Sequence, residues 1–127
     1  MTGVLTCALP ISRRRRYLLD GKPVEFATSY LPLDIARGTQ IAEPNPGPGG
    51  IYARLEDHGH EFAEFVETLQ ARLATKAEAS ELALSPGASV VHLIREARTT
   101  EDRVVEVCDT LMAADQFVFS YRIPAFD

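Results

Sequence analysis

A strand, a polar turn and a second strand occur twice in this chain, and this repetition limits the fold more than any other feature of the sequence. RRRRYLLDGKPVEFATS aligns with IREARTTEDRVVEVCDT at an offset of 81 residues, with Arg14 opposite Arg95. The matched pairs include Glu25 with Glu106 and Ser29 with Thr110. Two such hairpins predict a pseudo-symmetric antiparallel sheet, although any two amphipathic hairpins share part of this pattern.

The turn chemistry supports the first hairpin. Asp20-Gly21 is a strong two-residue turn signal, and it separates predicted strands over 13–19 and 23–31. Further along the chain we expect a short helix at 31–38, an irregular loop at 43–50, helices at 51–59 and 75–84, and strands at 89–97, 103–112 and 116–123. Residues 61–74 fit both a helix and a strand, and local propensity favours the helix.

The pleat divides the four arginines between the two faces of a strand. Arg14 and Arg16 share one face, and Arg13 and Arg15 share the other. On the returning strand, one face is more apolar and is the expected core face, and the other is smaller and more polar. The first face carries Val24, Phe26, Thr28 and Tyr30, and the second carries Glu25, Ala27 and Ser29. The second hairpin repeats the division, with Val105, Val107 and Leu111 against Glu106, Cys108 and Thr110.

A sheet face that carries arginine, glutamate and hydroxyl groups could bind an anionic or polyhydroxylated small molecule. Guanidinium groups bind carboxylate or phosphate in a bidentate manner, and each charge-assisted hydrogen bond contributes roughly 1.5–3 kcal/mol. The alternative is ordinary cross-strand pairing of arginine with glutamate on a solvated face. The pattern alone leaves both interpretations open.

Composition excludes several classes of protein. A net charge of −5 over 127 residues disfavours free-standing DNA binding, and two cysteines are too few for a disulfide framework. No apolar run reaches the roughly 18–20 residues that would span a bilayer. We therefore expect one cytoplasmic domain with no membrane association. Residues 1–12 have no clear period, and we interpret them as a non-native or truncated leader before a domain at 13–127.

Other chemistry finds little support in the sequence. His58 and His60 lie near acidic residues, but their spacing matches no standard zinc pattern, and we expect no metal site. Cys108 lies on a predicted strand, where a cysteine is more often a small buried hydrophobe than a nucleophile. No phosphate-binding loop, dinucleotide fingerprint or nucleophile elbow is present, so we expect no cofactor.

Four segments in order resemble the UTRA domain, the effector-binding and dimerisation half of HutC-type regulators in the GntR family of bacterial transcription factors. They are RRRRYLLDGKPVEFATSYLP, GPGGIYARLEDHG, ATKAEASELALSPGASVVHLIREA and VVEVCDTLMAADQFVFSY. The resemblance covers about residues 13–123. It implies an α+β, chorismate-lyase-like fold, in which short helices pack against an antiparallel sheet. It also implies that 62–73 is a strand, against local propensity.

In this family an N-terminal winged helix-turn-helix binds DNA, and this chain has no room for that module. The resemblance assigns Arg14 and Arg16 to the strand where phosphosugar-sensing members bind phosphate, and it places Tyr52 in the pocket wall. Together with the polar faces of the two hairpins, the predicted ligand-binding set is Arg14, Arg16, Glu25, Ser29, Tyr52, Arg95 and Glu106. Gly50 before Ile51-Tyr52 and Asp115-Gln116-Phe117 depart from the phosphosugar-binding members, which argues against a phosphosugar.

The sequence therefore predicts a non-enzymatic, homodimeric sensor of a small-molecule effector, belonging to a repressor that reaches DNA only through the missing N-terminal domain. Two alternatives stay open. The related fold includes chorismate lyase, so an enzyme acting on a small carboxylated substrate is one. A module that only dimerises is the other.

Overall fold

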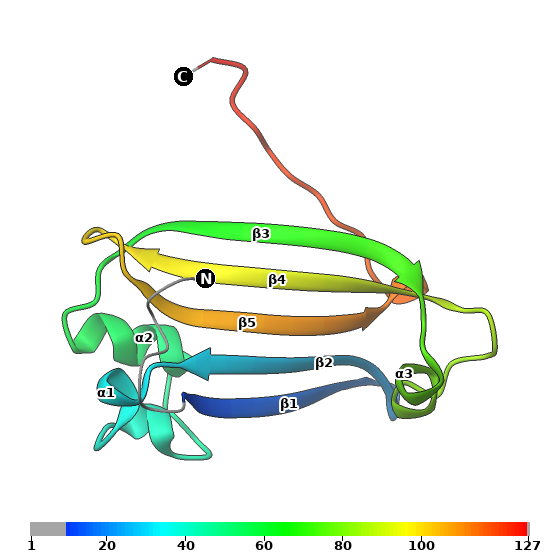
Figure 1. Ribbon diagram of the computed structural model, residues 1–127, viewed down its shortest axis with the longest axis horizontal. Coiled ribbons are helices and arrows are strands. Elements are labelled where there is room, and N and C mark those ends of the chain that lie inside the picture. The colour runs from blue at the N-terminus through cyan, green and yellow to red at the C-terminus, as the bar shows by residue number, and fades with distance from the viewer. Residues whose placement is uncertain (1–9, 127) are drawn as a thin grey trace.

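The computed structural model describes residues 10–126, which build one five-stranded antiparallel sheet with short helices (Figure 1). The strands are β1 (Ile11–Leu19), β2 (Lys22–Leu31), β3 (Phe62–Leu73), β4 (Ser89–Thr99) and β5 (Val104–Ala113). The helices are α1 (Leu33–Ala36), α2 (Gly50–Asp57) and α3 (Lys76–Glu81), with 3-10 turns η1 (Gln40–Ala42) and η2 (Ala114–Gln116). This architecture confirms the predicted α+β class.

Both predicted hairpins form and lie side by side. The strand order is β1-β2-β5-β4-β3, so β2 and β5 pair at the junction of the two hairpins. Asp20 and Gly21 both have positive φ, as a tight two-residue turn requires. The predicted cap of α3 is also present, because Thr75 and Glu78 form a reciprocal capping box.

Two segments differ from what local sequence patterns predict. Residues 62–73 form strand β3 along the whole of β4, so the propensity for helix was wrong and the strand implied by the family resemblance is confirmed. The predicted strand at 116–123 is not formed. After η2 the chain continues to residue 126 with no ladder partner among the described residues, and its side chains are largely exposed.

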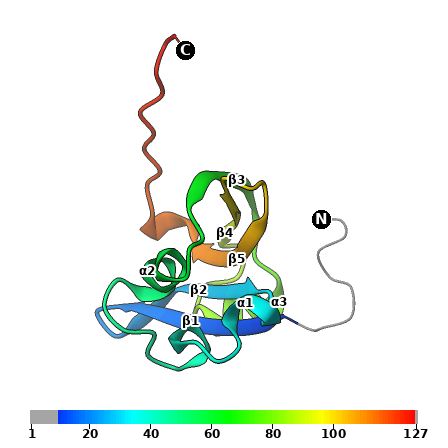
Figure 2. The same cartoon turned by 90° about the vertical axis from the view of Figure 1, so that its left-hand side faces the viewer.

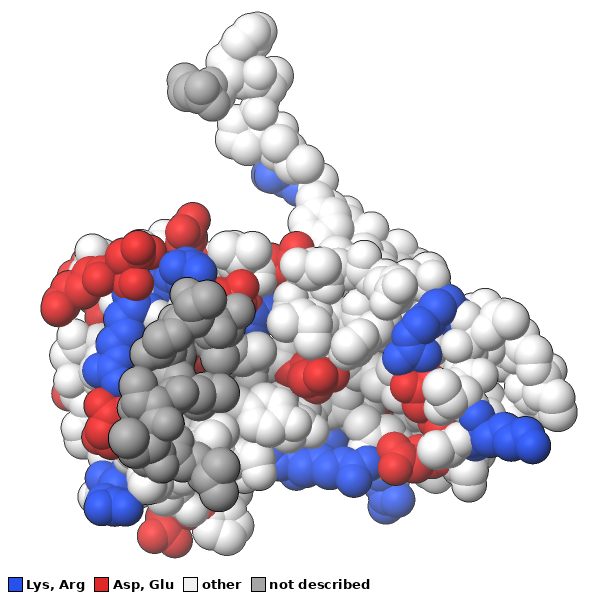
Figure 3. Space-filling model, viewed as in Figure 1, with Lys and Arg blue, Asp and Glu red and all other residues white. Residues whose placement is uncertain are grey.

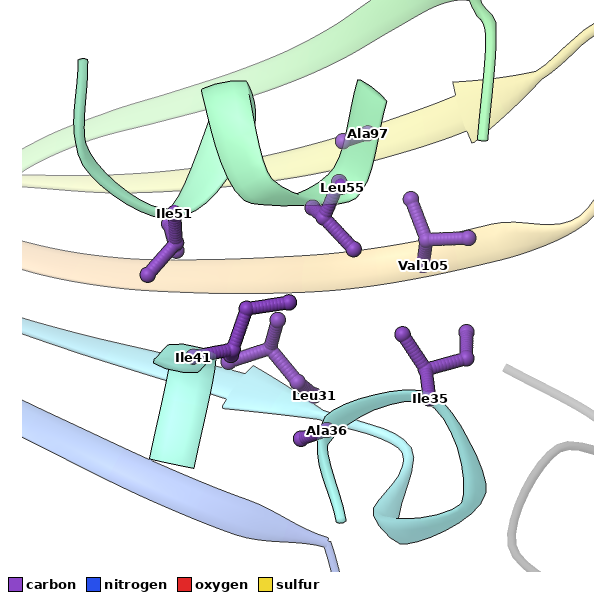
Figure 4. Packing of buried hydrophobic residues seen from close by; sticks show 8 residues of the cluster. All are labelled: Leu31, Ile35, Ala36, Ile41, Ile51, Leu55, Ala97 and Val105. Carbon is purple, nitrogen blue, oxygen red and sulfur yellow. The ribbon is translucent and has the colours of Figure 1, made fainter. Parts of the chain in front are cut away.

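The core lies between the sheet and the helices α1, η1 and α2 (Figure 4). The cluster consists of Leu31, Ile35, Ala36, Ile41, Ile51, Leu55, Ala97 and Val105. On β2 the buried residues are Val24, Ala27, Ser29 and Leu31, whereas Phe26 and Thr28 are only partly buried and Tyr30 is 41% exposed. The predicted core face of this hairpin was therefore wrong, because the helices cover its more polar face.

Between equivalent strand pairs, Tyr17–Glu25 and Ala97–Glu106, the second hairpin contains one residue more than the first, and this shifts the equivalence of the outer strands. Ala27 on β2 pairs with Arg15, and Cys108, which lies 81 residues later, pairs with Arg95. The structural counterpart of Arg95 is thus Arg15 at an offset of 80 residues (95 − 15), and not Arg14. Both hairpins also have a register shift at corresponding places, after Tyr17 and after Ala97.

The first residues of the domain extend slightly beyond the predicted boundary. Ile11 and Ser12 belong to β1 and pair with Leu31 and Tyr30, while residues 1–9 of the expected leader lie outside the described residues. Among the described helices, none is long and apolar enough to cross a membrane.

Candidate functional site

A cleft of about 430 Å³ opens on the helix-covered face of the sheet, beside the first turn of α2. Both hairpins contribute to it at equivalent positions. Its charged and aromatic lining comprises Arg15, Tyr17, Glu25, Tyr52, Arg95, Glu106 and Phe119. Because the two hairpins are pseudo-symmetric, the cleft contains two arginines and two glutamates in similar relative places.

Arg15 lies in the cleft without a carboxylate partner. Its Nη2 donates a hydrogen bond of 2.7 Å to Ser29 Oγ and lies 3.6 Å from Cys108 Sγ. Its Nε is buried and has no hydrogen-bond partner. Within residues 10–126, no acidic group lies within ion-pair distance of Arg15. A buried donor on an unpaired cation is costly, and an anionic ligand would satisfy it.

Arg95 has the opposite arrangement. Its Nη2 lies 2.6 Å from Glu67 Oε2 on β3, and its Nε donates to the same oxygen at 2.8 Å. The guanidinium also lies 5.5 Å from the centre of the Phe65 ring. The charge of Arg95 is therefore already balanced by a residue of this chain, so Arg95 shapes the wall more than it supplies free positive charge.

Tyr52 links helix α2 to the sheet at the back of the cleft. Its hydroxyl donates a 2.6 Å hydrogen bond to Glu106 Oε1, and its ring packs on Phe62 and Phe65 with centroid distances of 5.2 and 5.6 Å. Burial, and then the hydrogen bond to Glu106, raise the pKa of the Tyr52 hydroxyl well above its ordinary value. The hydroxyl therefore stays a donor, and it fixes a carboxylate that is only 2% exposed.

The glycine-rich loop before α2 allows the chain to turn sharply into the helix. Gly49 has φ of +80°, and a Cβ there would lie 2.7 Å from that of Ala53. Arg13 holds the earlier part of the same loop, because its guanidinium donates to the carbonyl oxygens of Ile41, Glu43 and Pro44. The arginine run thus anchors one wall of the cleft as well as lining it.

Glu25 is the second carboxylate that has access to the cleft. It lies on β2 opposite Met112, and it is close enough to Arg15 for the two charges to interact. Burial raises the pKa of the Glu25 carboxyl above its ordinary value, and the positive charge of Arg15 opposes part of that rise. A ligand that donates hydrogen bonds to Glu25 would relieve the cost of its burial.

The cleft brings together four of the seven predicted ligand-binding residues: Glu25, Tyr52, Arg95 and Glu106. Ser29 is fully buried next to the cleft and holds Arg15. Arg14 and Arg16 are not brought to the cleft, because the pleat turns them to the opposite face. There Arg14 pairs with Glu81 at 2.9 Å and lies 4.7 Å above the Phe26 ring.

Sequence reasoning missed Arg15 and Tyr17 as cleft residues. The signal was present in the repeat, since counting one extra residue in the second hairpin connection aligns Arg15, and not Arg14, with Arg95.

The opposite face, on the side of α3, shows positive and negative side chains interspersed, with no large patch of one sign (Figure 3). This mixture does not resemble a nucleic-acid surface. No cluster of His, Cys, Asp or Glu within residues 10–126 has the geometry of a metal site.

Comparisons with known proteins agree with this geometry. The UTRA domain model matches residues 10–118. An HTH-type transcriptional regulator of Streptomyces coelicolor is 38% identical over 112 residues, which cover 85% of this chain and 42% of the relative. A second HTH-type regulator, from Rhizobium meliloti, is 34% identical over 98 residues, which cover 76% of this chain and 39% of the relative. The chain therefore spans less than half the length of these relatives.

Solved structures share the fold. The ligand-binding domain of a GntR-family regulator from Bordetella bronchiseptica aligns with a TM-score of 0.75 at 22% identity, covering 91% of this chain and 73% of that one. The effector domain of PhnF from Mycobacterium smegmatis aligns with a TM-score of 0.76 at 23% identity, covering 91% and 70%.

Proposed function

Because the chain belongs to the UTRA domain family, we propose that it is the effector-sensing unit of a GntR-family transcriptional regulator of the HutC type. A small anionic metabolite binds in the cleft and changes how a separate winged-helix module reads DNA. The observation that carries this proposal is Arg15, a cation with a buried, unpartnered Nε in a cleft of about 430 Å³.

The cation and the hydrogen-bond acceptors that line the cleft suggest which groups the ligand carries. Arg15 suits a carboxylate or a phosphate, because guanidinium binds both in a planar, bidentate manner. Glu25, Glu106 and Thr110 suit hydroxyl or amino groups, which donate to carboxylates. A cleft of this volume suits one small metabolite. We therefore place Arg15, Glu25, Tyr52 and Glu106 in the ligand-binding set.

The signal passes to DNA by a shift between two dimer arrangements. An effector that binds one arrangement more tightly increases its population, and the spacing of the DNA-binding heads changes with it. In this proposal the regulator is a cytoplasmic homodimeric repressor, and the DNA-binding heads lie in the part of the protein that this chain does not span.

Binding, and not catalysis, is the role that the cleft supports. Tyr52 is held protonated against Glu106, and Arg95 is held against Glu67, so these groups are tied to one another and not poised to transfer protons. Incubation with chorismate tests the enzymatic alternative. Turnover of chorismate would favour the enzyme, and absence of turnover together with stabilisation by another metabolite would favour the sensor.

A thermal-shift screen of sugars, sugar phosphates, amino acids and nucleosides tests the proposal itself. A compound that binds the folded chain raises its melting temperature, whereas a module that only dimerises responds to none of them. We expect a hit among compounds with a carboxylate or phosphate group, and we expect Arg15→Ala to weaken its binding about 100-fold, since roughly two charge-assisted hydrogen bonds are lost.

The matched control replaces Arg14 and Arg16 with alanine on the opposite face. This pair is the binding site that family resemblance suggested, so the two variants compare two assignments directly. Calorimetry with the same compound should show near-normal affinity for the Arg14 and Arg16 double variant. Loss of binding in the double variant, with normal binding by Arg15→Ala, would move the site to the other face.

A further inference from the structure

We infer that the effector is a zwitterion, whose anionic group binds Arg15 and whose protonated amine binds Glu106. This ligand occupies the cleft of the proposed function, on which the inference therefore rests, and it carries a positive group in addition to the anionic group that suits Arg15. Amino acids and amino sugar phosphates both have this pair of groups. Two charged side chains of the cleft that lack partners of opposite sign point to it.

Glu106 is a nearly buried carboxylate with one unused oxygen. It lines the cleft and is only 2% exposed. Tyr52 donates to Oε1 at 2.6 Å, whereas Oε2 receives no hydrogen bond from residues 10–126 and is not sealed from solvent. No cation of these residues lies within ion-pair distance of Glu106. A buried charge is costly unless a counter-charge pairs with it, so Glu106 needs a positive partner just as Arg15 needs a negative one.

The strand register places these two charges near each other. The guanidinium of Arg15 donates to Ser29 Oγ at 2.7 Å and lies 3.6 Å from Cys108 Sγ, so it reaches the level of Cys108 on β5. Glu106 is two residues from Cys108 on the same face of this strand, a spacing of about 7 Å along the backbone. A small ligand with its two charges a few bonds apart can therefore contact both side chains.

Glu25 does not share the amine with Glu106. It pairs with Met112, which lies six residues from Glu106 along β5 (112 − 106), or about 20 Å. The two carboxylates therefore belong to different ends of the cleft. Glu25 is only partly buried, so water can solvate its charge, whereas Glu106 has little access to water. The need for a cationic partner is therefore greater at Glu106.

Two elements outside the sheet limit the access of water to this part of the cleft. Helix α2 and the segment that follows η2 lie on the same side of the sheet (Figure 2). They contribute Tyr52 and Phe119 to the cleft lining. Where aromatic rings replace water, the attraction between opposite charges is stronger than at an open surface. The cleft therefore provides an environment in which the charge of a ligand group matters for its affinity.

Charge also decides between an amine and the other groups that Glu106 could bind. A hydroxyl group would donate to Oε2 but would leave the negative charge unbalanced. An anion without an amine would bind Arg15 and bring a second negative charge beside Glu106. A protonated amine forms a charge-assisted hydrogen bond and balances the carboxylate. The cleft thus disfavours plain anions as well as favouring zwitterions.

Matched pairs of compounds test the inference on the unchanged chain. Each pair is an amine and the compound with a hydroxyl group in its place: amino acids with their 2-hydroxy acids, and amino sugar phosphates with the corresponding sugar phosphates. We expect one amine to raise the melting temperature, and calorimetry to show that it binds at least tenfold more tightly than its hydroxyl counterpart. The pair that responds shows which source supplies the zwitterion.

The two proposals fail in different ways. Equal binding of both members of the responding pair, or a response to plain anions alone, would overturn the zwitterion and leave the sensor intact. No response to any compound, in these pairs or in the wider screen, would overturn the sensor and the zwitterion with it.

Glu106→Gln locates the amine within the cleft. The amide oxygen can still accept from the Tyr52 hydroxyl, but the negative charge is removed. We therefore expect the tenfold preference for the amine to disappear and the affinity for inorganic phosphate to rise. Arg15→Ala should instead weaken the amine and its hydroxyl counterpart alike, because both use the same anionic group.

The matched control is Asp109→Asn, which removes the same charge from β5 on the face that carries Arg14. It should keep the preference for the amine. A preference that survives in Glu106→Gln, or that is lost equally in Asp109→Asn, would overturn the assignment to Glu106. A gain in phosphate affinity would show that Glu106→Gln is folded and that the effect is electrostatic. The comparison of matched pairs needs no variant, so the zwitterion can be refuted even if Glu106→Gln does not fold.

Discussion

The first and second hairpins have nearly the same backbone but place their arginines in different electrostatic environments. Arg15 and Arg95 occupy equivalent positions, opposite Ala27 and Cys108. Arg95 is neutralised by Glu67, because β4 has β3 as its outer neighbour. In the part of the chain that the structure describes, β1 is the outermost strand on the other side and has no such neighbour.

The difference shows how a repeated scaffold can acquire a directional binding site. Two equivalent arginines would give a symmetric cleft with no preference for the orientation of its ligand. One carboxylate from a neighbouring strand removes the free charge of Arg95 and leaves that of Arg15. The anionic group of a ligand is then directed toward the first hairpin.

The largest expected effect tests whether the two hairpins contribute equally to stability. Leu31 and Met112 are equivalent, and both are buried, with exposed fractions of 0% and 3%. Each change to alanine should lower the free energy of unfolding by about 2–5 kcal/mol, because each leaves a cavity. Leu31→Ala should cost more, since Leu31 packs under the helices whereas Met112 lines the open cleft. Urea denaturation checks this order, and a larger loss for Met112→Ala would contradict it.

Short-range chemistry in the sequence was sufficient for the turns and caps. Asp20-Gly21 and the Thr75 capping box are each determined by a few neighbouring residues, so they could be predicted. Strand β3 could not be predicted from its local pattern, because Phe62–Leu73 is stabilised by pairing with β4, which follows later in the chain. Only the resemblance to a known family supplied that long-range information.

The binding face depended on a single residue. An extra residue in the second hairpin connection changes the offset of the outer strands from 81 to 80, and a shift of one residue moves a side chain to the other face of the sheet. That shift exchanges Arg14 for Arg15. The composition of the hairpin faces was also misleading, because the more polar face carries the helices and the cleft. Polar residues at a functional face are a common reason why hydrophobic patterning fails.

An intermediate effect is expected from making the second hairpin resemble the first. Glu67→Gln removes the carboxylate that balances Arg95, so both arginines become available to an anion. We expect the affinity of the cleft for inorganic phosphate to rise about tenfold, equivalent to about 1.4 kcal/mol. Phosphate titrations followed by nuclear magnetic resonance would measure this rise.

The control for this change lies on the other face of the sheet. Glu81→Gln frees Arg14 from a similar ion pair outside the cleft, and it should leave the affinity of the cleft for phosphate nearly unchanged. Equal gains in the Glu67 and Glu81 variants would mean that the added affinity comes from net charge and not from the cleft.

The smallest expected effect concerns the equivalent glutamates, Glu25 and Glu106. Burial raises the pKa of the Glu25 carboxyl, so the folded state binds its proton more tightly than the unfolded state does. The stability of the chain should therefore fall as the pH rises from the ordinary pKa of a glutamate through the raised value in the folded state. Glu25→Gln removes this loss, and it should stabilise the chain by a few tenths of a kcal/mol at neutral pH, with no gain in acid.

Glu106→Gln is the matched variant, because it weakens the acceptor of the Tyr52 hydrogen bond and should destabilise the chain at neutral pH. Denaturation curves at several pH values would separate the two, and a gain for Glu25→Gln that is largest in acid would show that the Glu25 carboxylate is stabilised, not penalised, by its position beside Arg15.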